Sequence, residues 1–299
     1  MNHSNRNRTL IAIFVLFDLF VLGTFALYKI PSPVSDLLHK QVRRTRAEIA
    51  SFNLGETMPV TPLGSRISEV DGMTQVFVPS GEFLMGTDSR QSQKNRPQHA
   101  VTLSAFWVDQ TEVSNAMFQK CVDAGNCKAP LMGGLNPYYG KAKYKDHPVV
   151  YVSWEAAQNY CTWAGRRLPT EAEWEKAARG TDGRLYPWGD TLPNNQLANY
   201  DNAIGEPLPV DRYPLGASPY GALNMAGNVR EWVADWFNEF FYLSDISENP
   251  LGPVEGDTKA LRGGSYLDDE NEIRVFNRFF HPPASPGINR GFRCASDAE

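Results

Sequence analysis

Six charged residues lie close together near the C-terminus of this 299-residue chain. They are Asp268, Asp269, Glu270, Glu272, Arg274 and Arg278. Carboxylates at this density could bind a hard cation, an amine or a basic peptide, or contribute ligands to iron. A solvated acidic loop is the alternative, since runs of charge are usually exposed and the two arginines are near enough to neutralise it. The residues alone leave both interpretations open: a candidate ligand face, or an ordinary acidic loop.

Four cysteines form a second group with chemical potential. They are Cys121, Cys127, Cys161 and Cys294. None forms a CxxC pair, and no Cys/His cluster has zinc spacing. An even number in a chain with a membrane segment favours two disulfides and an oxidising compartment, with four buried thiols as the alternative.

The membrane segment runs from Thr9 to Tyr28 and reads TLIAIFVLFDLFVLGTFALY. It is about long enough to cross a bilayer as a helix, so we expect a short tail at 1–8 and an anchor at 9–30. A cleaved signal peptide is the alternative, although no clear cleavage site follows. Arg6 and Arg8 favour a cytoplasmic N-terminus, which places the C-terminal domain in the periplasm or outside the cell. Basic residues after the span favour the opposite orientation, but most of them lie farther from the membrane than Arg6 and Arg8 do.

Asp18 lies in the middle of this apolar segment. A carboxylate there is costly unless it is protonated or paired with a partner helix. Asp18 is therefore either a tolerated protonated residue or a contact with another membrane-protein subunit.

The elements that would position the charged loop follow the anchor. Residues 31–72 read as a juxtamembrane helix and linker, and residues 73–299 as one domain. Strands are expected at 74–79, 82–86 and 99–108, and helices at 153–164 and 170–180. Thr170 and Glu173 make a capping box, and Gly180 ends the second helix. The 24 glycines and 21 prolines indicate an α+β domain with many irregular loops, and a net charge of -5 gives no reason to expect nucleic acid.

Several motifs, in order, resemble the formylglycine-generating enzyme (sulfatase-modifying factor) family. The helix string RRLPTEAEWE at 166–175 carries the resemblance first. The other motifs are VPSGEFLMG (78–86), HPVVYVSWEAAQNYC (147–161), YPWGD (186–190), NMAGNVREWVADW (224–236), LRGGSY (261–266) and NRGFRC (289–294). The resemblance covers about residues 73–296 and implies a compact fold similar to C-type lectins. It also implies a Cys161–Cys294 disulfide, which leaves Cys121 and Cys127 as a local pair.

The same resemblance shows what is missing. Active members of the family use two copper-binding cysteines just after the GGS motif, and here Asp268 and Ile273 stand at those positions. A carboxylate is a poor copper(I) ligand and isoleucine is none, so copper is not expected, whereas iron stays open. No catalytic residue is assigned.

Calcium is expected instead. By residue match, one structural calcium would use Asn224, Gly227, Val229 and Glu231, the glycine and valine through their carbonyls. A second site would use Asn199 and Tyr200, although its partner loop at 201–210 is shortened. Capping of loops by the Asn224 and Glu231 side chains is the alternative.

Together these features predict a membrane-anchored, extracytoplasmic binding or accessory module, a non-catalytic subunit of a larger membrane complex. A metal-dependent oxidase or tailoring enzyme with non-cysteine ligands is the alternative. Formylglycine generation on sulfatases comes last, because it needs the missing cysteines. Whether the chain is an enzyme stays open, as does the ligand.

Overall fold

The computed structural model describes residues 62–90, 92–130, 134 and 136–298. The expected anchor at 9–30, Asp18 and most of the expected juxtamembrane segment lie outside the described residues. Within the described ranges, no helix is both long enough and apolar enough to cross a membrane.

The first sheet joins the beginning and the end of the domain. Its antiparallel order is β1 (Ser65–Ile67), β2 (Thr74–Val78), β5 (Phe106–Asp109) and β10 (Ala295–Asp297). Strand β1 pairs with β2 although it lies in the stretch that we assign to a linker. Asp71 of that stretch is also buried, where it accepts hydrogen bonds from Tyr160 and Arg166. The folded domain therefore begins before Met73.

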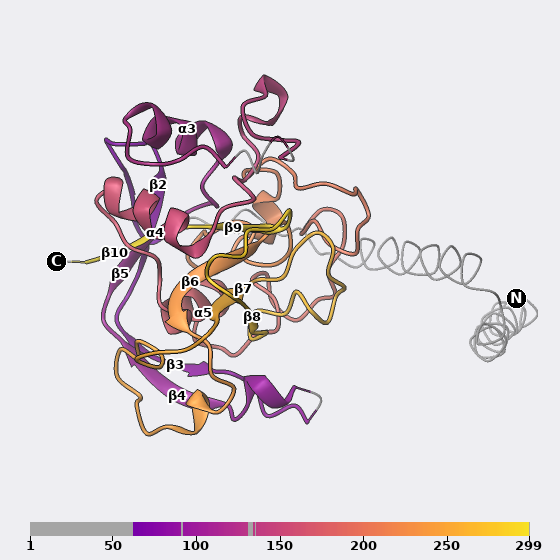
Figure 1. The fold of residues 1–299 in the computed structure, drawn as a ribbon. Coiled ribbons are helices and arrows are strands. Elements are labelled where there is room, and N and C mark those ends of the chain that lie inside the picture. Colours follow the sequence, from indigo (N-terminus) through magenta and orange to yellow (C-terminus); the bar gives the residue numbers. More distant parts are fainter. Residues whose placement is uncertain (1–61, 91, 131–133, 135, 299) are drawn as a thin grey trace, which may run out of the picture. The chain divides into compact units, whose positions relative to one another are not determined.

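Two further sheets complete the strand layers (Figure 1). Strands β3 (Gly81–Met85) and β4 (His99–Leu103) form an antiparallel pair. The third sheet has the order β8 (Phe279–His281), β7 (Lys259–Arg262), β6 (Arg230–Trp236) and β9 (Arg290–Phe292). The single strand predicted over 99–108 is wrong, because the chain leaves β3 at Ser104 and joins β2 from Phe106 onward.

Three α-helices are present in the described residues: α3 (Asn115–Asp123), α4 (Trp154–Trp163) and α5 (Glu171–Arg179). The last two confirm the predicted helices. Helix α5 begins with the expected capping box, since Glu173 N donates to Thr170 Oγ1 at 3.1 Å and Thr170 N donates to Glu173 Oε2 at 2.8 Å. Gly180 follows with a φ of 67° and donates its N–H to the Lys176 carbonyl, which ends the helix. Short 3-10 turns lie at η2 (Gln93–Asn95), η4 (Ala142–Tyr144), η5 (Pro214–Gly216) and η6 (Phe241–Leu243).

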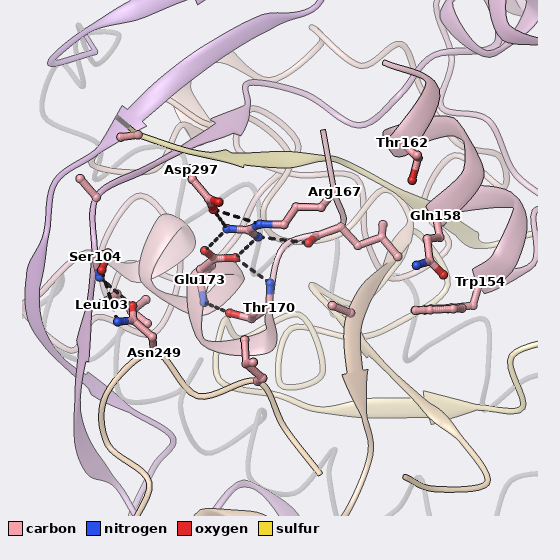
Figure 2. A pocket seen from close by; sticks show the side chains of 15 residues that line it. Leu103, Ser104, Trp154, Gln158, Thr162, Arg167, Thr170, Glu173, Asn249 and Asp297 are labelled. Carbon is pink, nitrogen blue, oxygen red and sulfur yellow. Dashed lines mark hydrogen bonds and ion pairs between the residues drawn. The ribbon is translucent and has the colours of Figure 1, made fainter. Parts of the chain in front are cut away.

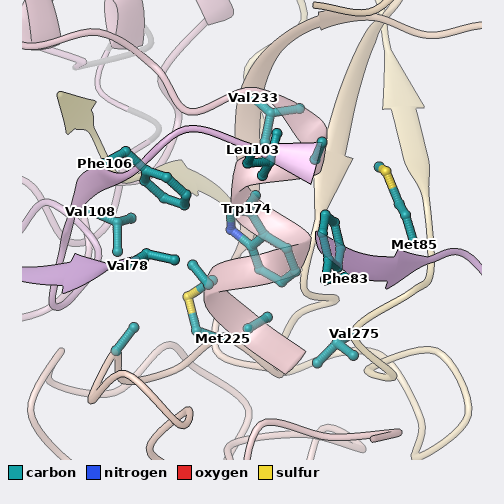
Figure 3. Packing of buried hydrophobic residues seen from close by; sticks show 14 of the residues in the cluster. Val78, Phe83, Met85, Leu103, Phe106, Val108, Trp174, Met225, Val233 and Val275 are labelled. Carbon is teal, nitrogen blue, oxygen red and sulfur yellow. The ribbon is translucent and has the colours of Figure 1, made fainter. Parts of the chain in front are cut away.

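Helix α5 lies at the centre of the domain, and all of its residues are buried. Figure 3 shows Trp174 of this helix between Phe106 and Val78 on one side and Phe83 on the other. Its indole N–H donates to Glu231 at 2.7 Å, so the ring is fixed by polar contact as well as packing. The mixed helix and sheet content confirms the predicted α+β class.

Candidate functional site

The loop after β7 occupies the position where the resemblance implies a pair of catalytic cysteines. Asp268, at the first position, is buried and accepts hydrogen bonds from Ser265 N and Oγ, both at 2.8 Å. Arg230 at the start of β6 donates to the same carboxylate. Asp268 therefore stabilises the turn that begins at Ser265 and forms an ion pair with Arg230.

Ile273, at the second position, is fully buried beside Tyr186 and Ala226. Gly264 permits this packing, because a Cβ built there would lie 2.9 Å from Ile273 Cγ2, and because its φ of 68° disfavours other residues. The side chains at both positions therefore stabilise the folded domain, one through polar contacts and the other through packing.

The other members of the candidate ligand face point in different directions. Asp269 accepts the backbone N–H groups of Asn271 and Glu272 and so closes a turn. Arg274 donates to Asn271, whereas Arg278 turns into the core. Glu270 and Glu272 stay at the partly open rim of the loop. The prediction that the two arginines neutralise the acidic loop is wrong for Arg278, and the six residues do not form one ligand face.

Arg278 belongs to a buried charge network around helix α5. It donates to Glu171 through Nε at 2.8 Å and Nη2 at 2.9 Å. Arg262 of β7 reaches both Glu171 and Glu175, and Glu175 also accepts from Arg179. Glu171 and Glu175 thus pair with arginines that are distant in sequence, and Glu175 also pairs with Arg179 one turn along the same helix. This pairing satisfies charges that burial alone would make costly.

Two further carboxyl groups are buried, and one of them, Asp235, adjoins this network through the Glu171 N–H. Burial, followed by the nearby charge of Glu171, raises the pKa of Asp235 to about 8. Burial likewise raises the pKa of Glu112 to about 7, in a site where its oxygens accept from Asn224 and Asn228. Low dielectric disfavours the charged form of a carboxyl group in both cases.

The side chains of the first expected calcium set already have other partners. Glu231 accepts from Arg293 Nε and Nη2 at 2.7 and 2.8 Å, and from Trp174. The Asn224 side-chain amide donates to Glu112 and to the Val210 carbonyl. A carboxylate already neutralised by a guanidinium is a poor calcium ligand, so the site expected from Asn224, Gly227, Val229 and Glu231 lacks its charged ligand in this arrangement.

The second expected set fits calcium better. Asn199 donates its amide to the Glu206 carbonyl and to Asn228, but its buried Oδ1 accepts no hydrogen bond in the described structure. An amide oxygen of this kind suits a hard cation, and the Tyr200 carbonyl is its neighbour in the chain. Calcium itself stays a prediction.

Both disulfides confirm the expected pairing. Cys161 joins Cys294 across 133 residues, and Cys121 joins Cys127 across six. No cysteine in the chain remains as a free thiol. Across the described ranges, His, Cys, Asp and Glu side chains are nowhere grouped in threes as a metal site would require.

A cavity lies away from the Asp268 loop and was not predicted from the sequence (Figure 2). It measures about 610 Å³ and has Trp154, Gln158 and Thr162 of α4 along one wall. Arg167 crosses it between two acids, donating to Glu173 and to Asp297. The three α4 residues are spaced four apart, which places them on one face of the helix, but the other lining residues come from several other segments. These are Leu103, Ser104, Ala105, Leu168, Thr170, Ala234, Asn249, Leu251 and Ala298.

Comparison with known proteins defines the class. The chain belongs to the sulfatase-modifying factor enzyme 1-like domain family, whose model matches residues 64–298. It is 36% identical over 284 residues to the formylglycine-generating enzyme of Streptomyces coelicolor, which covers 75% of this chain and 90% of that protein. It is 32% identical over 291 residues to the hercynine oxygenase of Mycolicibacterium smegmatis, which covers 83% of this chain and 68% of that protein.

Solved structures agree on the fold. PvdO from Pseudomonas aeruginosa superimposes with a TM-score of 0.68 at 24% identity, over 80% of this chain and 99% of that one. CarF gives a TM-score of 0.55 at 20% identity, over 76% of this chain and 99% of that one. At these identities the likeness extends to the fold alone.

Proposed function

We propose that this protein is a non-catalytic binding module of the sulfatase-modifying factor family, anchored in a membrane by its N-terminal segment and acting as a subunit of a larger extracytoplasmic assembly. The observation that carries the proposal is the state of the family's two catalytic positions. Asp268 is bound by Arg230 and Ser265, and Ile273 is buried in the core.

The cysteines support the same proposal. The two-cysteine chemistry of the resembled enzymes needs thiols, and all four cysteines here are joined in disulfides. The Cys161–Cys294 bridge joins helix α4 to the residue before β10. Reducing this bridge to supply a thiol would destabilise the domain.

An oxygenase or tailoring enzyme is the second candidate, favoured by the relative named hercynine oxygenase. That reading requires a redox metal bound by this chain. It therefore predicts iron or copper in stoichiometric amount in the purified protein, whereas the binding module predicts neither.

Purification from the native membrane in mild detergent separates the two. Co-purifying chains are identified by mass spectrometry, and bound metals are measured in the same sample. We expect stoichiometric protein partners without iron or copper. A solitary protein that carries either metal would overturn the binding module and favour the oxygenase.

A substitution in the membrane segment extends this experiment. If Asp18 is the contact with a partner subunit, Asp18→Leu loses that partner from the purified sample, because a paired intramembrane carboxylate has no apolar equivalent. A partner retained in full would show that Asp18 does not make the contact.

A further inference from the structure

The connection between β6 and β7, residues 237–258, exposes an unusual amount of apolar surface. Five of its large apolar side chains are exposed, by 52% to 98% of their area: Phe240, Leu243, Ile246, Leu251 and Val254. A cluster of exposed apolar side chains on one segment is typical of an interaction surface.

The same connection is acidic. Glu239, Asp245, Glu248, Glu255 and Asp257 alternate with the apolar residues, and residues 237–258 contain no lysine, arginine or histidine. All five acidic residues are exposed. The surface therefore combines apolar contact area with negative charge.

Backbone hydrogen bonds hold this connection against the rest of the domain, so its apolar side chains are exposed on an ordered segment. Thr102 N donates to the Ser247 carbonyl at 2.7 Å, and Asn249 N donates to the Thr102 carbonyl at 2.9 Å, which extends the edge of β4. In Figure 1 this orange segment runs beside the β3–β4 pair. Gly252 lies so close to Asp235 that a Cβ there would be 2.7 Å from its side chain. A surface held in this way needs little ordering on binding.

The cavity of Figure 2 continues this surface. Leu251 and Asn249 form part of its lining, and Figure 2 shows Trp154 on the side opposite Asn249. The Trp154 ring is fixed, because its indole N–H donates to the Val233 carbonyl at 2.7 Å. Within the cavity, the charge of Arg167 is outnumbered by the carboxylates of Glu173 and Asp297. A fixed aromatic side chain beside a cavity is the usual form of a binding hot spot.

We propose that residues 237–258 and the adjoining cavity form the docking surface for a basic, apolar segment of a partner protein. The proposal rests on the proposed function as a binding module and names the surface and the chemistry of the partner. Apolar side chains of the partner would enter the cavity between Trp154 and Leu251, while its lysines or arginines meet the surrounding acids. Anionic lipid headgroups and a second copy of the same acidic surface would both be repelled.

A direct binding experiment uses the full chain in non-ionic detergent and a fluorescent peptide of alternating lysine and leucine. We expect saturable binding to the wild type, at least tenfold weaker binding to Leu251→Asp/Val254→Asp and to Glu255→Lys/Asp257→Lys, and none of a leucine–glutamate peptide. Leu192→Asp is the matched control, since Leu192 is 52% exposed but lies outside the surface, and it should bind as the wild type does. Equal binding by the wild type and both docking-surface variants would overturn the proposal.

The same variants are then purified from the native membrane. Loss of the partner from the docking-surface variants, but not from Leu192→Asp, supports the proposal. A partner retained by every variant overturns the docking surface and leaves the binding module standing. The absence of any partner from the wild type defeats the proposed function itself. Binding to anionic vesicles, or self-association that Leu251→Asp/Val254→Asp abolishes, would replace the protein partner with lipid or with a second copy.

Discussion

Arg230 donates two hydrogen bonds to Asp268, from Nε to Oδ2 at 2.9 Å and from Nη2 to Oδ1 at 2.5 Å. The guanidinium also lies 3.9 Å from the centre of the Phe279 ring, so it is held from two sides. By the resemblance, Asp268 stands where active members of the family have a copper-binding cysteine. Here its carboxylate accepts hydrogen bonds from Arg230 and Ser265 within the fold.

Removing the carboxylate of this pair should destabilise the domain. Asp268→Ala leaves Arg230 largely buried without its anion, and we expect the free energy of unfolding to fall by about 3 kcal/mol. Urea denaturation measures the change. Glu270→Ala is the control from the same loop, with an expected change below about 0.5 kcal/mol. Equal effects of the two substitutions would show that Asp268 has no special structural role.

The two disulfides should differ in their contribution to stability. In the chain-entropy model, the Cys161–Cys294 bridge contributes about 5 kcal/mol and the Cys121–Cys127 bridge about 2 kcal/mol, because the closed loops differ so greatly in length. Each cysteine pair is replaced by alanine, and unfolding is followed in urea. A smaller loss for the long bridge than for the short one would contradict this order.

The buried carboxyl of Asp235 predicts a dependence of stability on pH. Its pKa is raised to about 8 in the folded protein, so the folded state retains a proton that the unfolded state releases near pH 4. The stabilisation is therefore complete below about pH 4 and is lost as the pH rises through 8. Asp235→Asn, which mimics the protonated form, should unfold at higher urea concentration than the wild type at pH 9 and at nearly the same concentration at pH 4.

The same comparison has an internal check. Glu171 N donates to Asp235 Oδ2 at 2.8 Å, and the asparagine carbonyl can accept that bond in the variant. A variant with the same pH profile as the wild type would show that Asp235 does not titrate in this range.

Calcium, if it binds, should act through Asn199 rather than Glu231. Asn199 Oδ1 is a buried oxygen without a hydrogen-bond partner in the described structure, whereas Glu231 is paired with Arg293. We expect calcium to raise the thermal midpoint of chelator-treated protein, and Asn199→Ala to abolish that rise. Glu231→Gln should lower the midpoint but preserve the response to calcium. The reverse pattern would restore the first of the two calcium sites expected from the sequence.

Local signals in the sequence were enough for parts of the fold. The capping box at Thr170 and the glycine at Gly180 define helix α5, because both act within one turn of the helix. Strand pairing was not accessible in the same way. The parallel pairing of Arg230 with Arg290 joins residues separated by 60 positions, and no local pattern specifies it.

The candidate site shows the same limit. Arg278 is four residues from Arg274, yet it pairs with Glu171, 107 residues away. The short distance between the two arginines in the sequence could not indicate that one stays with the loop and the other points into the core. Asp71 was placed in a linker for a similar reason, since its partners Tyr160 and Arg166 come from the other half of the chain.

The final strand has a consequence for how the protein is made. Arg293 neutralises Glu231 beneath the central helix, Cys294 closes the long disulfide, and β10 pairs with β5. Residues 293–295 are therefore buried against segments that lie far earlier in the chain. A nascent chain cannot complete its core until these residues have left the ribosome, and if the protein is secreted as proposed, an oxidant must reach it after they emerge. A stop codon before position 293 would remove central parts of the core.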